Sequence, residues 1–249
     1  MLLGIGHNKR SDIVPHWLHQ ATLATLKMPC QHVDIWESHI FDIGNSRQQV
    51  AEIFLKIPGL THILFVDDDI AVGNSDALNI MFKFLEEDKQ YIVSGLYYRR
   101  QKPHYPLIMA CEEKEDIIMF GFPYGETAPE NSIIKVGAVP AGFLLVKREV
   151  FEKIPKPWFV YGDPELTRKQ AKKGAPPGED IYFSLKARKC GFELFVDTRV
   201  DLIHYCPEWV GKKEVINKLL GTPETLDQDI KEINDVVKQR EAGVKTEIH

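Results

Sequence analysis

An uninterrupted apolar run that ends in three carboxylates constrains this chain more than any other feature. Ile63 to Val66 are all apolar, and Asp67, Asp68 and Asp69 follow directly. An apolar run without polar alternation is typical of a strand buried on both faces of a parallel sheet. Open α/β sheets bind their ligands at the carboxyl ends of such strands, where these three aspartates fall.

Three adjacent negative charges repel one another, so the triplet favours a counter-ion. The spacing of Asp67 and Asp69 allows two carboxylates at a turning strand end to reach one metal ion. Hard cations such as Mg2+ and Mn2+ prefer oxygen ligands, and they bind through few carboxylates plus substrate phosphates. The alternative interpretation is a solvated acidic turn that caps the next helix.

The amino-terminal half of the chain alternates strand and helix patterns. Strands are expected over residues 2–6, 31–36 and 91–94 and over the apolar run that ends at Asp67, and helices over about 12–26, 48–58 and 75–85. Residues 43–47 are interpreted as a loop that leads into the second helix. This order predicts a mostly parallel sheet with right-handed crossovers.

The pattern changes after about residue 106. Short β-prone pieces at 107–110, 117–120 and 133–136 predict an antiparallel extension of the same sheet. Further on, helices are expected over 147–154 and from 179 to 189, and strands over 192–196 and 200–205. Residues 161–178 are interpreted as a loop that becomes ordered on binding, because long loops in compact domains are usually functional or disordered.

The length of 249 residues fits one catalytic domain, residues 1–208, and a helical tail, residues 209–249. Apolar residues in this tail recur at helical spacing, which suits packing on the catalytic domain, a homodimer or the binding of a partner. The net charge of -5 gives no global attraction to nucleic acid or anionic membranes. The four cysteines form no CxxC pair, and no apolar run reaches the ~18 residues of a membrane span. A cytoplasmic protein is expected.

Two further groups could supply chemistry to this strand end. Glu179 and Asp180 begin a helix after Gly178, where a carboxylate could act as a general base or simply complement the helix dipole. His204 ends a late strand and could join the aspartates as a ligand for Mn2+, although a lone histidine is more often structural.

A basic loop and a glycine-rich segment complete the set of candidates. Arg99 and Arg100 follow the strand at 91–94, so they are expected at the same edge as the aspartates, where arginine forks bind phosphate. A solvated loop is the alternative. Gly142, in a stretch of small residues, would allow close approach to a ligand, and tight packing of the sheet is an equal alternative.

Together these motifs resemble a known family. The strand ending in Asp67-Asp68-Asp69, the small-residue strand 138–143, the Gly178-Glu179-Asp180 helix start and the late His204 are similar to family 2-type glycosyltransferases of the GT-A fold. The resemblance covers roughly residues 1–206 and is greatest to small single-domain phage or bacterial members. It implies an α/β, Rossmann-like fold with a mostly parallel central sheet.

The resemblance also implies roles for individual residues. Asp67 and Asp69 would hold a divalent metal on the donor diphosphate, His204 would be a further ligand, and Asp68 would contact the ribose or the metal. Asp180, or alternatively Glu179, would deprotonate the acceptor hydroxyl.

Other parts of the chain would then surround the donor. Arg47 and Asn45 match the place of an Arg-Asn pair near the nucleotide, although the order here is Asn-Ser-Arg. Residues 7–10 would approach the nucleotide base, and the loop 161–178 would close over the donor.

These roles predict a metal-dependent glycosyltransferase that uses Mn2+ or Mg2+ and a nucleotide-sugar, with a UDP-sugar as the first candidate. Direct displacement assisted by Asp180 favours inversion. The hydroxyl acceptor stays open between a glycan, a lipid, a protein and a modified DNA base. Two alternatives stay open as well. One is a nucleotidyltransferase or metal-dependent phosphohydrolase, and the other is a non-catalytic nucleotide- or carbohydrate-binding module.

Overall fold

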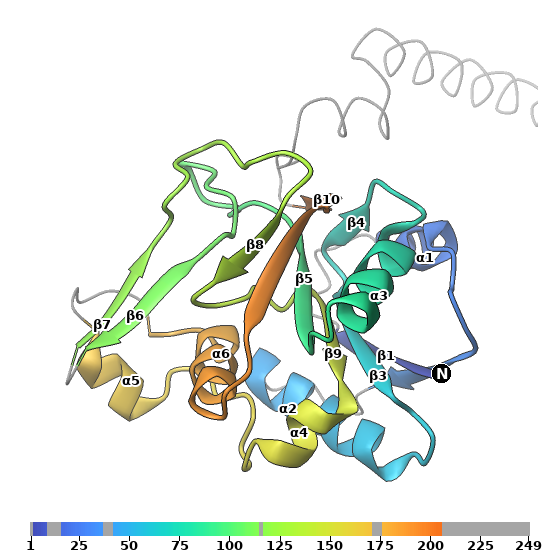
Figure 1. The fold of residues 1–249 in the computed structure, drawn as a ribbon, viewed down its shortest axis with the longest axis horizontal. Helices are drawn as coiled ribbons and strands as arrows, with labels where there is room; N and C mark the ends of the chain where they lie inside the picture. Colours follow the sequence, from blue (N-terminus) through green and yellow to red (C-terminus); the bar gives the residue numbers. More distant parts are fainter. Residues whose placement is uncertain (1, 9–15, 37–41, 115–116, 171–175, 206–249) are drawn as a thin grey trace, which may run out of the picture. The chain divides into compact units, whose positions relative to one another are not determined.

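The computed structural model describes residues 2–8, 16–36, 42–114, 117–170 and 176–205 (Figure 1). The predicted tail, residues 209–249, lies outside these residues. Within the described residues, the central feature is an eight-stranded sheet with the order β2-β1-β3-β9-β5-β10-β4, and β8 pairs with β10. Its strands are β1 (Leu3–Asn8), β2 (His32–Trp36), β3 (His62–Asp67), β4 (Ile70–Val72), β5 (Ile92–Leu96), β8 (Ile133–Val136), β9 (Phe143–Lys147) and β10 (Leu194–His204).

The sheet is mostly parallel, as the sequence predicts. β1 pairs in parallel with β2 and β3, and β5 pairs in parallel with β10. β9 lies between these two groups and is antiparallel to both β3 and β5. Antiparallel strands β4 and β8 flank β10. Both parallel groups therefore run in the same direction, and their carboxyl ends meet at one edge.

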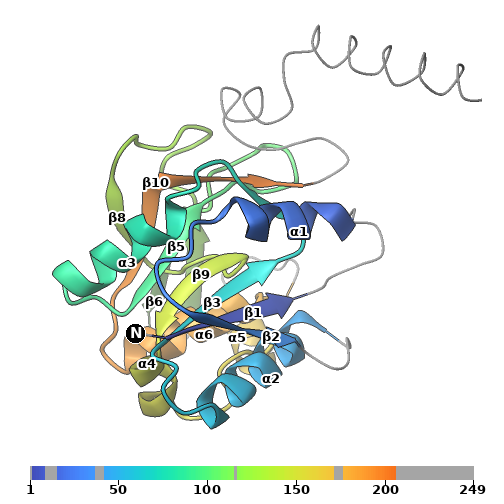
Figure 2. The same ribbon diagram turned by 90° about the vertical axis from the view of Figure 1, so that its right-hand side faces the viewer.

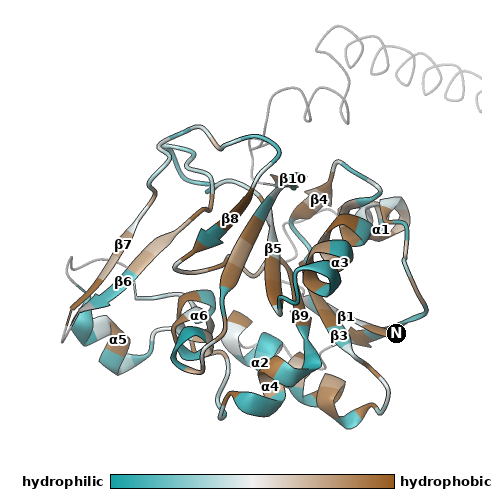
Figure 3. Ribbon diagram, viewed as in Figure 1, coloured by the Kyte–Doolittle hydropathy of each residue, from teal (hydrophilic) through white to brown (hydrophobic). Residues whose placement is uncertain are grey.

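Helices cover both faces of the sheet (Figure 2). The helices are α1 (His16–Thr25), α2 (Ile43–Lys56), α3 (Ala77–Glu87), α4 (Arg148–Lys153), α5 (Pro164–Lys169) and α6 (Glu179–Lys189). Ile63 and Phe65 of β3 pack in the core with α2, α4 and α6, whereas Leu64 and Val66 pack in the core with α3. The uninterrupted apolar run is thus explained by two cores, one on each face. Figure 3 shows that strands of the central sheet, such as β5, are coloured mainly as hydrophobic. Among the described helices, none has the length and apolarity that a membrane crossing requires.

Several expectations for the elements were wrong. Residues 43–47 are the first turn of α2, because Asp42 caps a helix that starts at Ile43. β4 was not foreseen, since three residues are too few for a periodic signal. The two expected late strands are one strand, β10, with a register shift between Asp197 and Asp201.

The antiparallel extension also differs in part from its prediction. β8 joins the central sheet, but β6 (Ala110–Lys114) and β7 (Ile117–Gly121) form a separate two-stranded sheet. The small-residue segment 138–142 precedes β9 and is not itself a strand. The stretch 161–178 contains the short helix α5 (Figure 1).

Candidate active site at the carboxyl edge of the sheet

The aspartate triplet lies at the end of β3 and is almost entirely buried. Asp67, Asp68 and Asp69 are 4%, 6% and 1% exposed. The backbone N–H of Asp67 donates to the carbonyl oxygen of Gly142 over 2.9 Å, which ties the end of β3 to the segment before β9. Buried carboxylates need compensating charge, so the partners of this triplet define the site.

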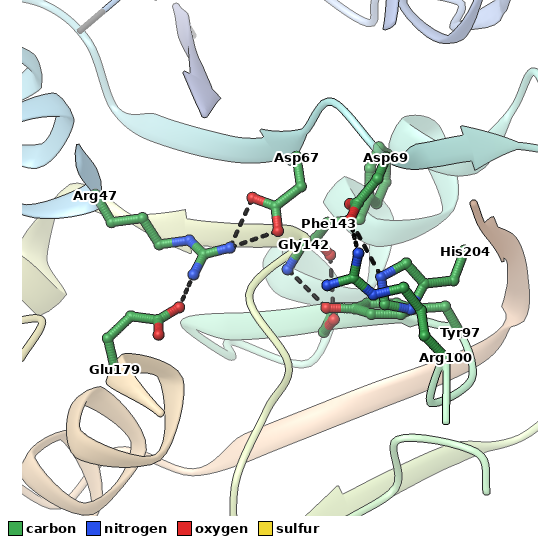
Figure 4. Close-up of polar contacts among 10 residues, drawn as sticks. Arg47, Asp67, Asp69, Tyr97, Arg100, Gly142, Phe143, Glu179 and His204 are labelled. Atoms are coloured by element: carbon green, nitrogen blue, oxygen red, sulfur yellow. Dashed lines mark hydrogen bonds and ion pairs between the residues drawn. The ribbon is translucent and has the colours of Figure 1, made fainter. Parts of the chain in front are cut away.

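Arg47 is the partner of the first aspartate (Figure 4). It comes from the first turns of α2 and is 3% exposed. Its Nη2 lies 2.6 Å and 2.7 Å from the two carboxylate oxygens of Asp67, and its Nη1 donates to Glu179 Oε1 at the start of α6. One guanidinium therefore joins α2, β3 and α6.

The third aspartate has a different pair of partners. Asp69 Oδ2 lies 3.1 Å from Arg100 Nη1 and 3.5 Å from His204 Nε2. His204 Nδ1 lies 2.8 Å from the carbonyl oxygen of Tyr98. Because a carbonyl oxygen only accepts, Nδ1 carries the proton in this contact and Nε2 is directed to Asp69. The Tyr205 N–H donates to the carbonyl oxygen of Asp69 over 2.7 Å, which orders this corner.

Asp69 and His204 fit a divalent cation as a pair of ligands. A carboxylate oxygen and an imidazole nitrogen 3.5 Å apart are spaced as two ligands of one ion, and the bond from Nδ1 orients the ring. Within the described ranges, no group of three or more His, Cys, Asp or Glu side chains is arranged to hold a metal ion. Water and substrate phosphates would therefore supply the remaining ligands, as is usual for Mg2+. A bond from Asp67 to the ion would require its pair with Arg47 to open.

Asp180 is the half-buried carboxylate of this edge. Loss of hydration raises the pKa of its carboxyl group, the nearby Arg47 opposes that rise, and the charge of Asp67 adds to it. Its Oδ1 accepts the N–H of Ile181 over 2.8 Å. A Cβ on Gly178 would lie 2.4 Å from the same oxygen, so the glycine leaves room for this carboxylate. Glu179, in contrast, is 6% exposed and engaged by Arg47.

Tyr97 supports the site, and the sequence did not single it out. The N–H of Gly142 donates to its hydroxyl oxygen over 2.7 Å, and its ring meets the His204 ring edge-on at 5.2 Å. Burial and the charge of Asp67 raise the pKa of the Tyr97 hydroxyl well above its ordinary value. A Cβ on Gly142 would lie 2.7 Å from that hydroxyl, so Gly142 allows this contact. The one sequence feature that could have pointed to Tyr97 is its position directly after β5, at the edge where ligands bind.

Two predicted residues make other contacts. The N–H of Asn45 donates to Asp42 over 2.9 Å, so Asn45 takes part in the cap of α2 and is exposed. Arg99 Nη2 donates to Gln101 over 2.9 Å, and its guanidinium lies over the ring of Phe122 at 5.8 Å. Arg100 is therefore the arginine of this loop that reaches the aspartates.

The end of β1 contributes an aromatic cluster to the same edge. His7 is 1% exposed, stacks on Trp36 with ring centroids 3.9 Å apart, and has Nε2 2.9 Å from Asp34 Oδ1. Burial lowers the pKa of His7, and Asp34 opposes this effect. Asn8 pairs with Asp67 in the β1–β3 register, so the cluster lies near the triplet. Trp36, 51% exposed, was not anticipated from sequence, and residues 9–10 lie outside the described residues.

Comparisons with known proteins show the fold of this chain. No family model and no curated protein sequence matches it. Among solved structures it is similar to A197 from STIV, with a TM-score of 0.53, 16% identity and coverage of 85% of this chain and 93% of that one. It is also similar to GalNAc-T7 with UDP, GalNAc and Mn2+, with a TM-score of 0.42, 14% identity and coverage of 67% of this chain and 31% of that one.

These two structural similarities do not support conclusions equally. The second is too distant to carry an argument, and the first shows a shared fold over most of both chains. The sheet order, with two parallel groups of strands separated by the antiparallel β9, agrees with the expected fold. The chain thus has a mixed α/β fold with a mostly parallel central sheet, consistent with the Rossmann-like GT-A type.

Proposed function

We propose that this chain is a metal-dependent glycosyltransferase that moves a sugar from a nucleotide-sugar to an acceptor hydroxyl. The main support is that one edge of the sheet brings together three groups. These are the pair Asp69–His204, the two arginines that contact the aspartates, and Asp180, whose carboxyl pKa is raised. Sugar transfer needs charge neutralisation at a departing diphosphate and a base for the acceptor hydroxyl. This edge offers candidates for both.

Each residue has a defined task in this proposal. Asp69 and His204 would hold Mn2+ or Mg2+, which would neutralise the diphosphate when bound. Asp180 accepts the proton of the acceptor hydroxyl as the hydroxyl oxygen attacks the anomeric carbon. The bond from that carbon to the diphosphate oxygen breaks, the nucleoside diphosphate leaves, and the product has inverted configuration. Arg47 positions α6, which carries Asp180, against the end of β3. Trp36 and His7 would face the nucleotide base, for which a UDP-sugar is the first candidate.

A panel of nucleotide-sugars with Mn2+ and hydroxyl acceptors tests the proposal. Wild type is expected to release a nucleoside diphosphate and form a glycosylated product. Asp180→Asn is expected to lower kcat by roughly 10²- to 10⁴-fold, because it removes the base, while donor affinity stays within about threefold. Asp69→Asn is expected to remove the Mn2+ dependence of donor binding.

The matched control is Asp88→Asn, at an exposed aspartate just after α3, which should behave as wild type. The pH profile adds a second readout. Asp180 must be deprotonated to act, and its pKa is raised, so the acid limb of kcat/KM should lie above the ordinary aspartate range near ~3.9. Release of pyrophosphate or inorganic phosphate instead of a nucleoside diphosphate would contradict sugar transfer.

A further inference from the structure

Arg100 covers the carboxylate that is best placed to hold a metal. Its Nη1 lies 3.1 Å from Asp69 Oδ2, the same oxygen that faces His204 Nε2 at 3.5 Å. The Arg100 side chain is 39% exposed and that of Asp69 is 1% exposed, so a partly solvated guanidinium contacts a buried carboxylate. Figure 4 shows Arg100 and His204 converging on Asp69. A buried carboxylate thus meets a positive charge that has open solvent behind it.

The loop that carries Arg100 is held at both ends. The N–H of Arg99 donates to the Tyr105 carbonyl and the N–H of Leu107 donates to the Tyr97 carbonyl, each over 2.9 Å. His104 Nδ1 lies 2.9 Å from the carbonyl oxygen of Arg99. Because the backbone is anchored in this way, rotation of the long Arg100 side chain is enough to uncover Asp69.

A divalent cation and the Arg100 guanidinium compete for one position. An ion held by Asp69 Oδ2 and His204 Nε2 would lie within a few ångströms of the guanidinium, since both cations use the same oxygen. Two positive charges at that separation beside a buried carboxylate repel each other. Occupancy by one therefore lowers occupancy by the other.

We infer that Arg100 is a resident counter-cation of Asp69 that metal binding displaces towards the donor phosphates. This inference rests on the proposed function and assigns Arg100 two successive partners. Without metal, the arginine neutralises a buried carboxylate that would otherwise be costly. With metal, the guanidinium turns outward, where its fork can bind a diphosphate in bidentate fashion. Metal and donor thereby bind cooperatively.

Titration of the full chain with Mn2+, followed by calorimetry and by the electron spin resonance of free Mn2+, tests this inference. Arg100→Gln removes the competitor and should tighten Mn2+ binding by roughly three- to tenfold, the scale of a half-exposed ion pair. In saturating Mn2+, the same variant should bind a nucleoside diphosphate more weakly. A variant that binds Mn2+ more tightly and the nucleoside diphosphate more weakly is the result expected if Arg100 moves from Asp69 to the phosphates.

Arg99→Gln is the matched control, because it removes the same charge from the adjacent residue, which contacts Gln101 and Phe122 instead. It should change Mn2+ affinity less than about twofold. In an Asp69→Asn background, Mn2+ binding should be lost with or without Arg100→Gln, because the carboxylate that the ion and the guanidinium share is gone.

The outcomes separate the inference from the proposed function. If wild type binds Mn2+ and Arg100→Gln binds it equally or more weakly, the inference is wrong and the metal site stands. If wild type does not bind Mn2+ but Arg100→Gln does, the result supports competition between Arg100 and the metal for Asp69. If neither binds Mn2+, both the inference and the metal-dependent function are wrong. Thermal unfolding of each variant shows whether the fold is kept.

Discussion

At the scale of single residues, Arg47 joins charges that the sequence places far apart. Asp67 and Glu179 are both almost fully buried, and each contacts a different nitrogen of this guanidinium. A planar fork with several donors suits such a bridge better than lysine does. These two ion pairs explain how Asp67 and Glu179 are tolerated as buried carboxylates beside the other two aspartates of the triplet, which are buried as well.

Removal of Arg47 should destabilise the fold strongly. Arg47→Gln leaves two buried carboxylates without their shared cation, and breaking a buried ion network typically costs ~3–5 kcal/mol. Urea unfolding at neutral pH measures this loss. The matched comparison is Arg47→Gln with Asp67→Asn and Glu179→Gln, which removes all the charges and should recover most of the stability. Equal losses in the single and triple variants would show that packing of the side chain, and not charge, dominates.

At the scale of elements, the cap of α2 decides where Arg47 lies. Asp42 accepts the N–H of Asn45 over 2.9 Å and starts the helix at Ile43, so Arg47 falls at the fifth helical residue. The glycine at position 44 also fits closely, because a Cβ there would lie 3.0 Å from the backbone nitrogen of Tyr161. The cap and this close fit hold the first turn of α2, directly before Arg47, in place.

Loss of this cap should weaken the first turn of α2. Asp42→Ala removes the side-chain acceptor and is expected to lower the free energy of unfolding by about 1 kcal/mol. Asp42→Asn keeps an acceptor oxygen and should stay within a few tenths of a kcal/mol of wild type. Urea unfolding of both variants makes the comparison. An equal loss in both would mean that the charge of Asp42, and not its hydrogen bond, matters.

At the scale of the whole molecule, β3 has buried titratable side chains at both ends, the aspartates at its carboxyl end and a histidine at its start. His62, its first residue, is 4% exposed, with Nδ1 2.9 Å from Thr61 Oγ1 and Nε2 3.3 Å from Glu86 Oε1. Burial lowers the pKa of His62 to about 4, Glu86 opposes this effect, and Lys147 adds to it. The folded protein therefore keeps His62 neutral in mildly acidic solution.

Stability should fall on acidification below the ordinary histidine pKa. Between pH ~6.5 and the lowered value of about 4, the unfolded chain binds a proton that the folded chain does not, so stability decreases as pH falls. The full effect is ~3 kcal/mol, from about 2.5 pKa units at 1.36 kcal/mol each. His62→Gln should flatten the pH dependence of urea unfolding over this range.

Local pattern was sufficient for most of the elements. The apolar run before Asp67 predicted β3, and the helices expected over about 75–85 and from 179 to 189 were confirmed as α3 and α6, because such patterns are carried by neighbouring residues. The placement of β9 between β3 and β5 was not predictable in this way. It depends on pairing with Phe65 and Val93, residues far away in the sequence.

The sequence by itself determined that three carboxylates end a strand buried on both faces, and that charge must be neutralised there. Only the tertiary structure decided which groups neutralise it. Arg47 neutralises Asp67 from α2, Arg100 neutralises Asp69 from the loop after β5, and Nε2 of His204 faces Asp69 from the end of β10. The reason is physical: a run of residues records its own periodicity and charge, whereas an ion pair depends on side chains that only the folded sheet brings within a few ångströms.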